Sequence, residues 1–205
     1  MRVVVLGGAG QLGRAVVQAL VERGHAVCAA VRRPPVPPLV GSVEVRLADA
    51  RNTTEIRGAI RGFDALVNAI GAGTLRRNDV ESTTTAVAVA VAHEVGVERY
   101  IAISAGMVAL DWPIFKYLLR PLMFRNILAE HRRVEGIVNT SPLAWTIVRP
   151  PRLTNRPPTG YLASSELQPR LLSAARADVA AFIADELESN QHVRQAVFVA
   201  SRRIR

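Results

Sequence analysis

A run of buried-strand character leads directly into a glycine-rich turn near the start of the chain, and this feature constrains the fold most. The segment VVVLGGAGQLG, residues 3–13, places four apolar residues before glycines at 7, 8, 10 and 13. A segment with helical spacing follows, from Leu12 to Arg23. Such a turn needs unusual backbone dihedrals and a close approach that a Cβ would block. In this strand–turn–helix context, the G-x-G-x-x-G spacing predicts a dinucleotide site with the pyrophosphate at the helix amides.

The rest of the chain alternates strand-like and helix-like segments. Apolar or alternating runs predict strands at 1–7, 25–32, 43–49, 65–71, 99–104, 145–150 and 196–201. Helices are predicted at 12–23, with Gly24 as its C-cap, and at 52–61, 79–95, 113–139 and 177–188, the fourth interrupted near Pro121. This alternation predicts a doubly wound parallel α/β sheet with helices on both faces, in one domain spanning 1–205. Residues 105–128 and 150–170 are expected as loops on the substrate side, the second because it is rich in proline, threonine and serine.

The end of the second predicted strand indicates which nucleotide binds. A site that prefers NAD usually carries an acidic residue about 20 positions after the glycines, where it holds the ribose hydroxyls. Here that position is Arg33, with Arg32 beside it. A guanidinium can bind two phosphate oxygens at once, so the pair favours NADP(H) over NAD(H). The alternative is surface charge beside a proline-rich loop. The expected pyrophosphate contacts are Gly7, Ala9, Gly10, Gln11, Leu12 and Gly13.

Two further strand ends are expected to contact the nucleotide. Asp49 and Ala50 follow the third predicted strand, where a carboxylate could meet the adenine, although Asp49 could equally cap the next helix. The fourth strand ends in NAIG, and small residues at Ala69, Ile70 and Gly71 would let the backbone lie against a ribose. An ordinary strand–loop junction is the alternative there.

Composition excludes several classes of protein. The chain has 205 residues and 49% hydrophobic residues, which is ample for a packed core. Its net charge is +9, carried almost wholly by arginine, but no aromatic-rich basic stripe accompanies the arginines, so nucleic acid is not the expected partner. A single cysteine, Cys28, fits a reducing cytoplasm. The longest apolar stretch is broken by charges and prolines, and no histidines have metal-ligand spacing, so neither a membrane span nor a metal site is predicted.

Several segments together resemble one superfamily. VVVLGGAGQLG, the arginines after the second strand, LAD, NAIG, IAISAG and SPLAWTIVRPPRLTNRPPTGY are similar to the atypical short-chain dehydrogenases/reductases. Within that superfamily the chain resembles the small NAD(P)H-binding reductases, the group of biliverdin reductase B (flavin reductase) and the NmrA-like proteins. The resemblance covers nearly the whole chain. It implies a Rossmann fold, bound NADP(H), and a substrate pocket over the nicotinamide, with Ser104, Pro150 and Pro151 beside the cofactor.

The chain departs from the superfamily at its usual catalytic pair. Many members use Tyr-x-x-x-Lys, but the only lysine, Lys116, stands at that spacing from no tyrosine. Ser104 resembles the family's active-site serine position, and His131 resembles a histidine of the flavin and biliverdin reductases. His131 could donate a proton, since histidine titrates near neutrality. The alternatives are a hydroxyl satisfied at a strand end for Ser104 and a partly exposed helix residue for His131.

Three functions are compatible with these residues. One is an NADPH-dependent reductase that transfers hydride to a flavin, a quinone or another small conjugated acceptor and needs little acid catalysis. Another is a non-catalytic NADP(H) sensor of NmrA-like type, and a weaker third is a nucleotide-sugar epimerase or dehydratase. The stretch MVALDWPIFKYLLRPLMF, residues 107–124, would form a pocket wall, buried core or a dimer contact. The protein is expected as a monomer or a homodimer.

Overall fold

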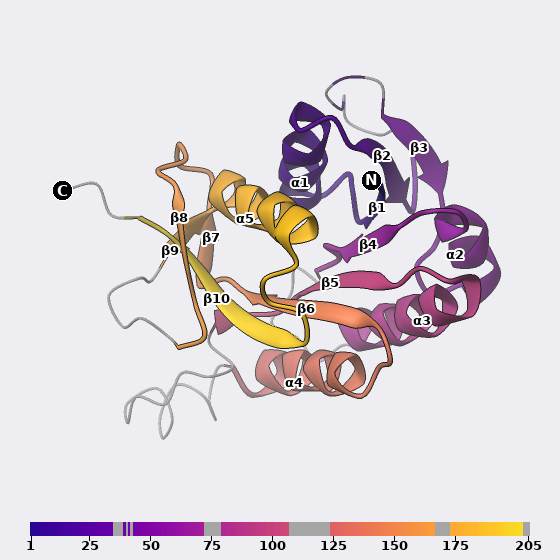
Figure 1. Ribbon diagram of the computed structural model, residues 1–205. Helices are drawn as coiled ribbons and strands as arrows, with labels where there is room; N and C mark the ends of the chain where they lie inside the picture. Colours follow the sequence, from indigo (N-terminus) through magenta and orange to yellow (C-terminus); the bar gives the residue numbers. More distant parts are fainter. Residues whose placement is uncertain are drawn as a thin grey trace.

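One eight-stranded sheet forms the centre of the molecule, in the order β3-β2-β1-β4-β5-β6-β10-β8 (Figure 1). This computed structural model describes residues 1–34, 39, 41, 43–71, 79–106, 124–166 and 173–202. The strands of the sheet are β1 (Arg2–Leu6), β2 (Ala26–Val31), β3 (Glu44–Leu47), β4 (Ala65–Asn68), β5 (Arg99–Ile103), β6 (Ala144–Arg149), β8 (Tyr161–Ser164) and β10 (Gln195–Ser201). Every pairing from β3 to β10 is parallel, and the edge strand β8 runs antiparallel to β10. The predicted doubly wound Rossmann-type fold is confirmed.

Helices cover both faces of the sheet (Figure 1). They are α1 (Gln11–Glu22), α2 (Thr53–Ile60), α3 (Val80–Val95), α4 (Arg125–Asn139) and α5 (Arg176–Ser189). The central strand β1 shows why two layers form. Val3 and Val5 point into a core completed by α1 and α5, whereas Val4 and Leu6 point into a second core shared with α2 and α3. A strand buried on both faces needs a continuous apolar run, which is what the sequence supplies.

The observed ends of the elements follow local chemistry. Asn52 caps α2, because its side chain accepts hydrogen bonds from the backbone N–H groups of Thr54 and Glu55. The C-cap of α1 is Arg23 rather than the predicted Gly24, which lies one residue beyond with a φ of +78°. Of the helix predicted at 113–139, the structure describes residues from Phe124 onward, and α4 begins at Arg125. Residues 107–123 lie outside the described part of the chain, as do 167–172.

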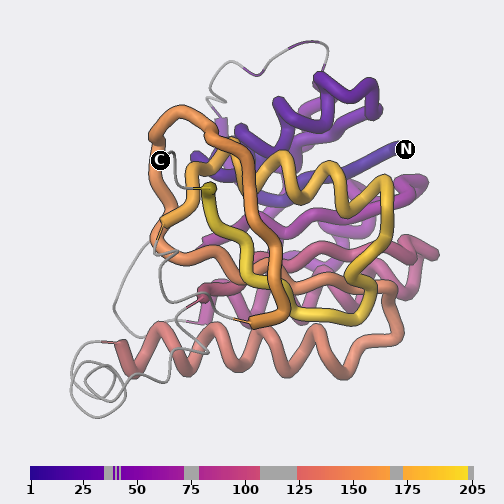
Figure 2. Tube along the Cα trace, turned by 60° about the vertical axis from the view of Figure 1, so that its left-hand side comes forward, coloured from indigo at the N-terminus to yellow at the C-terminus, as the bar shows by residue number. Residues whose placement is uncertain are grey.

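The segment after β6 is more regular than its composition indicated. It contains β7 (Arg152–Thr154) and β8, and β7 pairs with β9 (Ser173–Ala175) in a separate two-stranded parallel sheet. Figure 2 shows β8 lying along β10 at the edge of the main sheet. These short strands lack a long apolar or alternating run, and only pairing with distant residues defines them. Within the described residues, no helix is long and apolar enough to cross a membrane.

Candidate functional site

The glycine turn lies at the carboxyl end of β1, as predicted. Gly7 has a φ of +73°, a conformation that favours glycine, and its carbonyl oxygen accepts a 2.9 Å hydrogen bond from the N–H of Gly10. A Cβ on Gly8 would lie 2.7 Å from the Cβ of Ala29, and one on Gly13 would overlap the carbonyl of Gly7. Only glycine therefore permits this close packing of turn, helix and strand.

The amino end of α1 is open to an anion. The helix begins at Gln11, and its N-cap, Gly10, offers no side chain to accept from the first backbone amides. Unpaired amides and the positive end of the helix dipole favour a phosphate at such a position. Among the other predicted pyrophosphate contacts, Ala9 is half-buried in the turn and Leu12 is buried against the core. The cradle that glycine leaves and the uncapped amides fit a dinucleotide pyrophosphate.

A cavity of about 310 Å³ lies beside this turn at the carboxyl edge of the sheet. Eight of the predicted cofactor residues line it: Gly7, Gly10, Arg32, Asp49, Ala50, Ala69, Ile70 and Gly71. The sequence interpretation missed the remaining lining residues: Leu6, Ala30, Ala48, Arg51, Val80 and Thr84. Arg51 could have been found from its place two residues after Asp49. Val80 and Thr84 come from the first turns of α3, which only the fold brings to this edge.

The two predicted arginines differ in their placement. Both are exposed at the end of β2, but Arg32 lines the cavity and Arg33 does not. At the end of β3, Asp49 also lines the cavity, and one of its carboxylate oxygens accepts a 3.0 Å hydrogen bond from the N–H of Arg51. The cap of α2 is Asn52, so the structure gives Asp49 a turn-forming contact and a position on the cavity wall.

Buried hydrogen bonds hold the end of β4 in place. The side-chain amide of Asn68 donates to the hydroxyl of Tyr100 over 3.1 Å, and its oxygen accepts from the N–H of Ile70. Burial raises the pKa of Tyr100 to about 12, so this hydroxyl stays protonated at neutral pH. The result is a fixed turn that presents Ala69 to Gly71 to the cavity and contacts the glycine turn, since a Cβ on Gly7 would lie 3.1 Å from the Ala69 carbonyl.

The two predicted catalytic residues are both buried, and each faces a different carboxylate. The Ser104 hydroxyl donates to Glu135 over 2.8 Å, and Glu135 also accepts two hydrogen bonds from Arg149. Nδ1 of His131 lies 3.1 Å from a carboxylate oxygen of Glu81, at ion-pair distance but outside hydrogen-bond geometry. Ser104 and His131 are therefore not joined to each other by a hydrogen bond.

The surroundings of His131 approach the cavity on one side. The other carboxylate oxygen of Glu81 would lie 3.8 Å from a Cβ on Gly71, a lining residue. Pro150 is buried, and its carbonyl accepts a 2.7 Å hydrogen bond from the N–H of Gly106, while Pro151 is half-buried. Neither proline lines the cavity. In the apolar stretch 107–124, only Phe124 is described, as the N-cap of α4.

Within the part of the chain that the structure describes, no three His, Cys, Asp or Glu side chains gather in a way that could hold a metal. The two described tyrosines are buried or hydrogen-bonded away from the cavity. Tyr100 is buried, and the hydroxyl of Tyr161 donates to Asp185 on α5. Tyr117 lies outside the described residues.

Comparison with known proteins adds to this geometry. A family model described as NAD(P)H-binding matches residues 7–190. The chain belongs to this NAD(P)H-binding family. The match runs from the glycine turn to the end of α5, so it includes every lining residue of the cavity except Leu6.

Proteins that are similar to this NAD(P)H-binding chain in sequence or structure carry different activities in their names. It is 28% identical to the uncharacterized sugar epimerase YhfK of Bacillus subtilis (strain 168), over 96% of this chain and 92% of that protein. Among solved structures, the oxidoreductase ylbE of Lactococcus lactis has a TM-score of 0.87 at 18% identity, covering 99% of this chain and 92% of its own.

Two more solved structures carry names that concern cofactor and substrate. A short-chain dehydrogenase/reductase of Veillonella parvula DSM 2008, in complex with NADP, gives a TM-score of 0.82 at 19% identity, covering 98% of this chain and 94% of that one. SP1627 of Streptococcus pneumoniae TIGR4, a proposed NADH-flavin reductase, gives a TM-score of 0.80 at 22% identity. The match covers 98% of this chain and 100% of that one. These likenesses show the fold, and with the family match they confirm the predicted resemblance to NAD(P)H-binding reductases.

Proposed function

We propose that this protein is an NADPH-dependent reductase that transfers hydride to a flavin, a quinone or another small conjugated acceptor. One observation carries the proposal: the cavity beside the glycine turn has the Arg32 guanidinium, and not a carboxylate, at the end of β2. A carboxylate there would hold ribose hydroxyls, whereas a guanidinium attracts a 2′-phosphate. The NADP bound to the Veillonella parvula protein of the same fold supports this choice of nucleotide.

The residues around the cavity would divide the work of binding. The first amides of α1 would hold the pyrophosphate, Arg32 the 2′-phosphate, and Asp49 and Ala50 the adenine side. Ala69 to Gly71 would lie along the other half of the dinucleotide, toward Ser104, Pro150 and Pro151. The cofactor supplies the hydride, so the protein's task is to orient it and to exclude water.

The absent Tyr-x-x-x-Lys pair restricts the acceptor. A carbonyl needs a proton donor as hydride arrives, but a flavin or quinone delocalises the added electrons and needs less help. His131 is the residue that could hold a proton near the cavity, since it lies beside Glu81 and Glu81 borders Gly71. Ser104 would act through position, because its own proton is directed at Glu135.

The deciding experiment is a titration with NADPH and NADH, followed by assays of NADPH oxidation with FMN, riboflavin and quinones. Selective NADPH binding with turnover supports the reductase. His131→Asn should lower turnover while leaving NADPH affinity unchanged, and an exposed residue of the same helix, Arg132→Gln, serves as the control. If neither nucleotide binds, the interpretation of the glycine turn as a pyrophosphate site is wrong. A panel of nucleotide sugars tests the activity that the name of YhfK suggests.

A non-catalytic NADP(H) sensor is the second candidate. It is favoured by the engagement of Ser104 with Glu135 and by the burial of His131 against Glu81, because neither of these two residues then presents a proton openly to a substrate. The sensor predicts tight NADPH binding without turnover over the whole acceptor panel. It also predicts that binding partners recovered with NADPH differ from those recovered with NADP⁺.

A further inference from the structure

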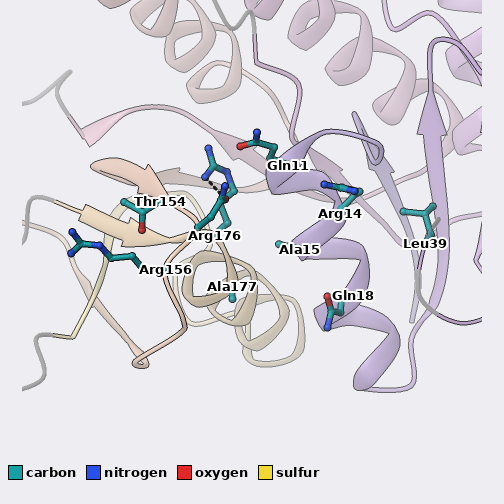
Figure 3. A pocket seen from close by; sticks show the side chains of 10 residues that line it. Gln11, Arg14, Ala15, Gln18, Leu39, Thr154, Arg156, Arg176 and Ala177 are labelled. Atoms are coloured by element: carbon teal, nitrogen blue, oxygen red, sulfur yellow. Dashed lines mark hydrogen bonds between the residues drawn. The ribbon is translucent and has the colours of Figure 1, made fainter. Parts of the chain in front are cut away.

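A second cavity lies along the first two turns of α1. Its volume is about 320 Å³, and it opens between α1, the start of α5 and the residues after β7 (Figure 3). The lining residues are Gln11, Arg14, Ala15, Gln18, Leu39, Thr154, Asn155, Arg156, Arg176 and Ala177. This set shares no residue with the nucleotide cavity, although Gln11 directly follows Gly10, so the two cavities adjoin at the start of α1.

The charge of this second cavity is of one sign. Three arginines line it, and no carboxylate does. Within the described residues, Arg14 and Arg156 have no ion pair, and the Arg176 side chain donates to the neutral side-chain oxygen of Asn155 over 2.7 Å. The acidic residue nearest to Arg176 in sequence is Asp178. It is buried and accepts hydrogen bonds from the backbone amides of Thr159 and Gly160. Among the residues that the structure describes, no carboxylate therefore neutralises the positive charge of the cavity.

Several other arginines of the molecule do pair with a carboxylate. Arg23 pairs with Asp185, Arg57 with Glu94, and Arg149 with Glu135. A chain with a net charge of +9 leaves some arginines unpaired, and three of them line this one cavity. Guanidiniums that converge without a carboxylate are suited to a phosphate, which can accept two hydrogen bonds from each.

The orientation of the side chains indicates which arginines would hold the ligand. In Figure 3 the guanidinium of Arg14 is turned toward the side of the cavity where Gln11 and Arg176 lie, and Arg156 extends away from it. The first residues of both α1 and α5 line the cavity, and their N-caps, Gly10 and Ala175, offer no side-chain acceptor. The two helix dipoles therefore add to the attraction that the arginines exert on an anion.

We propose that this cavity is a second anion site, which binds the phosphate monoester of a small molecule through Arg14 and Arg176 while NADP(H) occupies the first. Thr154 ends β7, and Asn155 and Arg156 follow it in the segment 150–170 that is expected on the substrate side, so the phosphate can belong to the acceptor or to a separate small anion. The proposal rests on the NADP(H) binding of the proposed function, but it goes beyond that function and does not depend on hydride transfer.

The first arm of the test measures binding without turnover. The protein is first saturated with NADP⁺, which fills the nucleotide cavity. It is then titrated at constant ionic strength with inorganic phosphate and, separately, with phenyl phosphate, and the heat of binding is measured by calorimetry. Saturable binding is expected. Arg14→Gln and Arg176→Gln should each weaken it by ~10-fold or more, as the loss of a charge-assisted hydrogen bond does. Arg132→Gln on α4, which removes an exposed arginine elsewhere, should leave it unchanged.

Two results of this arm would overturn the proposal. One is the absence of saturable phosphate binding to the NADP⁺-loaded protein. The other is a pair of variants that bind phosphate normally but bind NADP⁺ more weakly, which would make the cavity part of the cofactor site. Circular dichroism of each variant checks that it is folded, and Arg14→Lys, which keeps the charge but loses the fork, should have an intermediate affinity.

The second arm identifies the source of the phosphate and uses FMN against riboflavin, which differ in the phosphate alone. If the acceptor supplies the group, both glutamine variants raise KM for FMN, and leave kcat and the KM for riboflavin unchanged. If a separate anion supplies the phosphate, the glutamine variants keep the KM for FMN and the KM for riboflavin unchanged, while their affinity for phosphate still falls. Failure of the proposed function appears as absent turnover with phosphate binding intact, so the two failures are distinguishable.

Discussion

Two groups of arginines, one at each edge of the sheet, differ in how their charge is balanced. At the amino edge, Arg99 of β5 and Glu186 of α5 are 5% and 1% exposed and lie 2.8 Å apart. Both groups of this pair have further partners: Arg99 also donates to Asn190 and Thr146, and Glu186 also accepts from the backbone N–H of His192. At the carboxyl edge, Arg32, Arg14 and Arg176 line two cavities, and within the described residues none of them pairs with a carboxylate.

This difference separates charges that hold the fold from charges that are available to a ligand. A buried ion pair must be fully hydrogen-bonded to repay its desolvation, so its partners are fixed and none is open to a ligand. Burial lowers the pKa of Arg99, against the opposing effect of Glu186, which shows how strongly this guanidinium depends on its partner. An exposed arginine costs little to leave unpaired, so the carboxyl edge can keep its positive charge for an incoming phosphate.

The largest effect is expected at the amino edge, where Glu186→Gln removes the charge that balances Arg99. Breaking one half of a buried pair costs about 3–5 kcal/mol, so the free energy of unfolding in urea should fall by that order. Arg57→Gln breaks an exposed pair with Glu94 and should leave the unfolding free energy nearly unchanged. If the two variants proved equally stable, the claim that the buried Arg99–Glu186 pair holds the fold would be wrong.

Gly13→Ala should have the next largest effect, because the new Cβ would overlap the carbonyl of Gly7. Overpacking of this kind costs about 1–3 kcal/mol, and the displaced turn should also weaken NADPH binding. Gly58→Ala is the matched control. Nothing lies within 4 Å of a Cβ at this position in α2, so alanine should stabilise the helix slightly. Urea unfolding and a fluorescence titration of NADPH measure both effects, and normal NADPH affinity in Gly13→Ala would argue against the turn as the pyrophosphate site.

The smallest change to the fold, and the sharpest test of the carboxyl edge, is Arg32→Ala. The variant should unfold like the parent protein, since Arg32 is exposed. Its affinity for NADPH should fall by about 10-fold or more through the lost phosphate contact, with little change for NADH. Arg33→Ala should affect both nucleotides less, because Arg33 does not line the cavity. Equal losses for NADPH and NADH in Arg32→Ala would contradict a 2′-phosphate contact.

Local signals in the sequence were sufficient for most of the fold. The continuous apolar run of β1 and the glycines after it indicated a doubly buried strand and a phosphate-binding turn, and both the strand and the turn are present. The NAIG segment was expected at the cavity for the same reason, since short side chains at a strand end leave room for a ligand. The strand and the turn could be predicted because each depends on neighbours within a few residues along the chain, while their contacts with a nucleotide stay predictions.

Other features were beyond the sequence because they depend on distant partners. The short strands β7 and β9 exist only as a pair, and β8 depends on β10. Ser104 and Arg32 looked alike as polar residues at strand ends, but the fold places Glu135 against Ser104 and leaves Arg32 on a cavity wall.

The sequence by itself determined the alternation of strands and helices, the glycine turn and the excess of arginine, because composition and local spacing encode them directly. Tertiary structure alone decided which charges are neutralised. It brought Glu186 to Arg99 across 87 residues of chain, and it gathered Arg14 and Arg176 around one hollow with no carboxylate among its lining residues. The physical reason is that the free energy of a charge depends on its burial and its neighbours, and both are set by packing between elements remote in sequence.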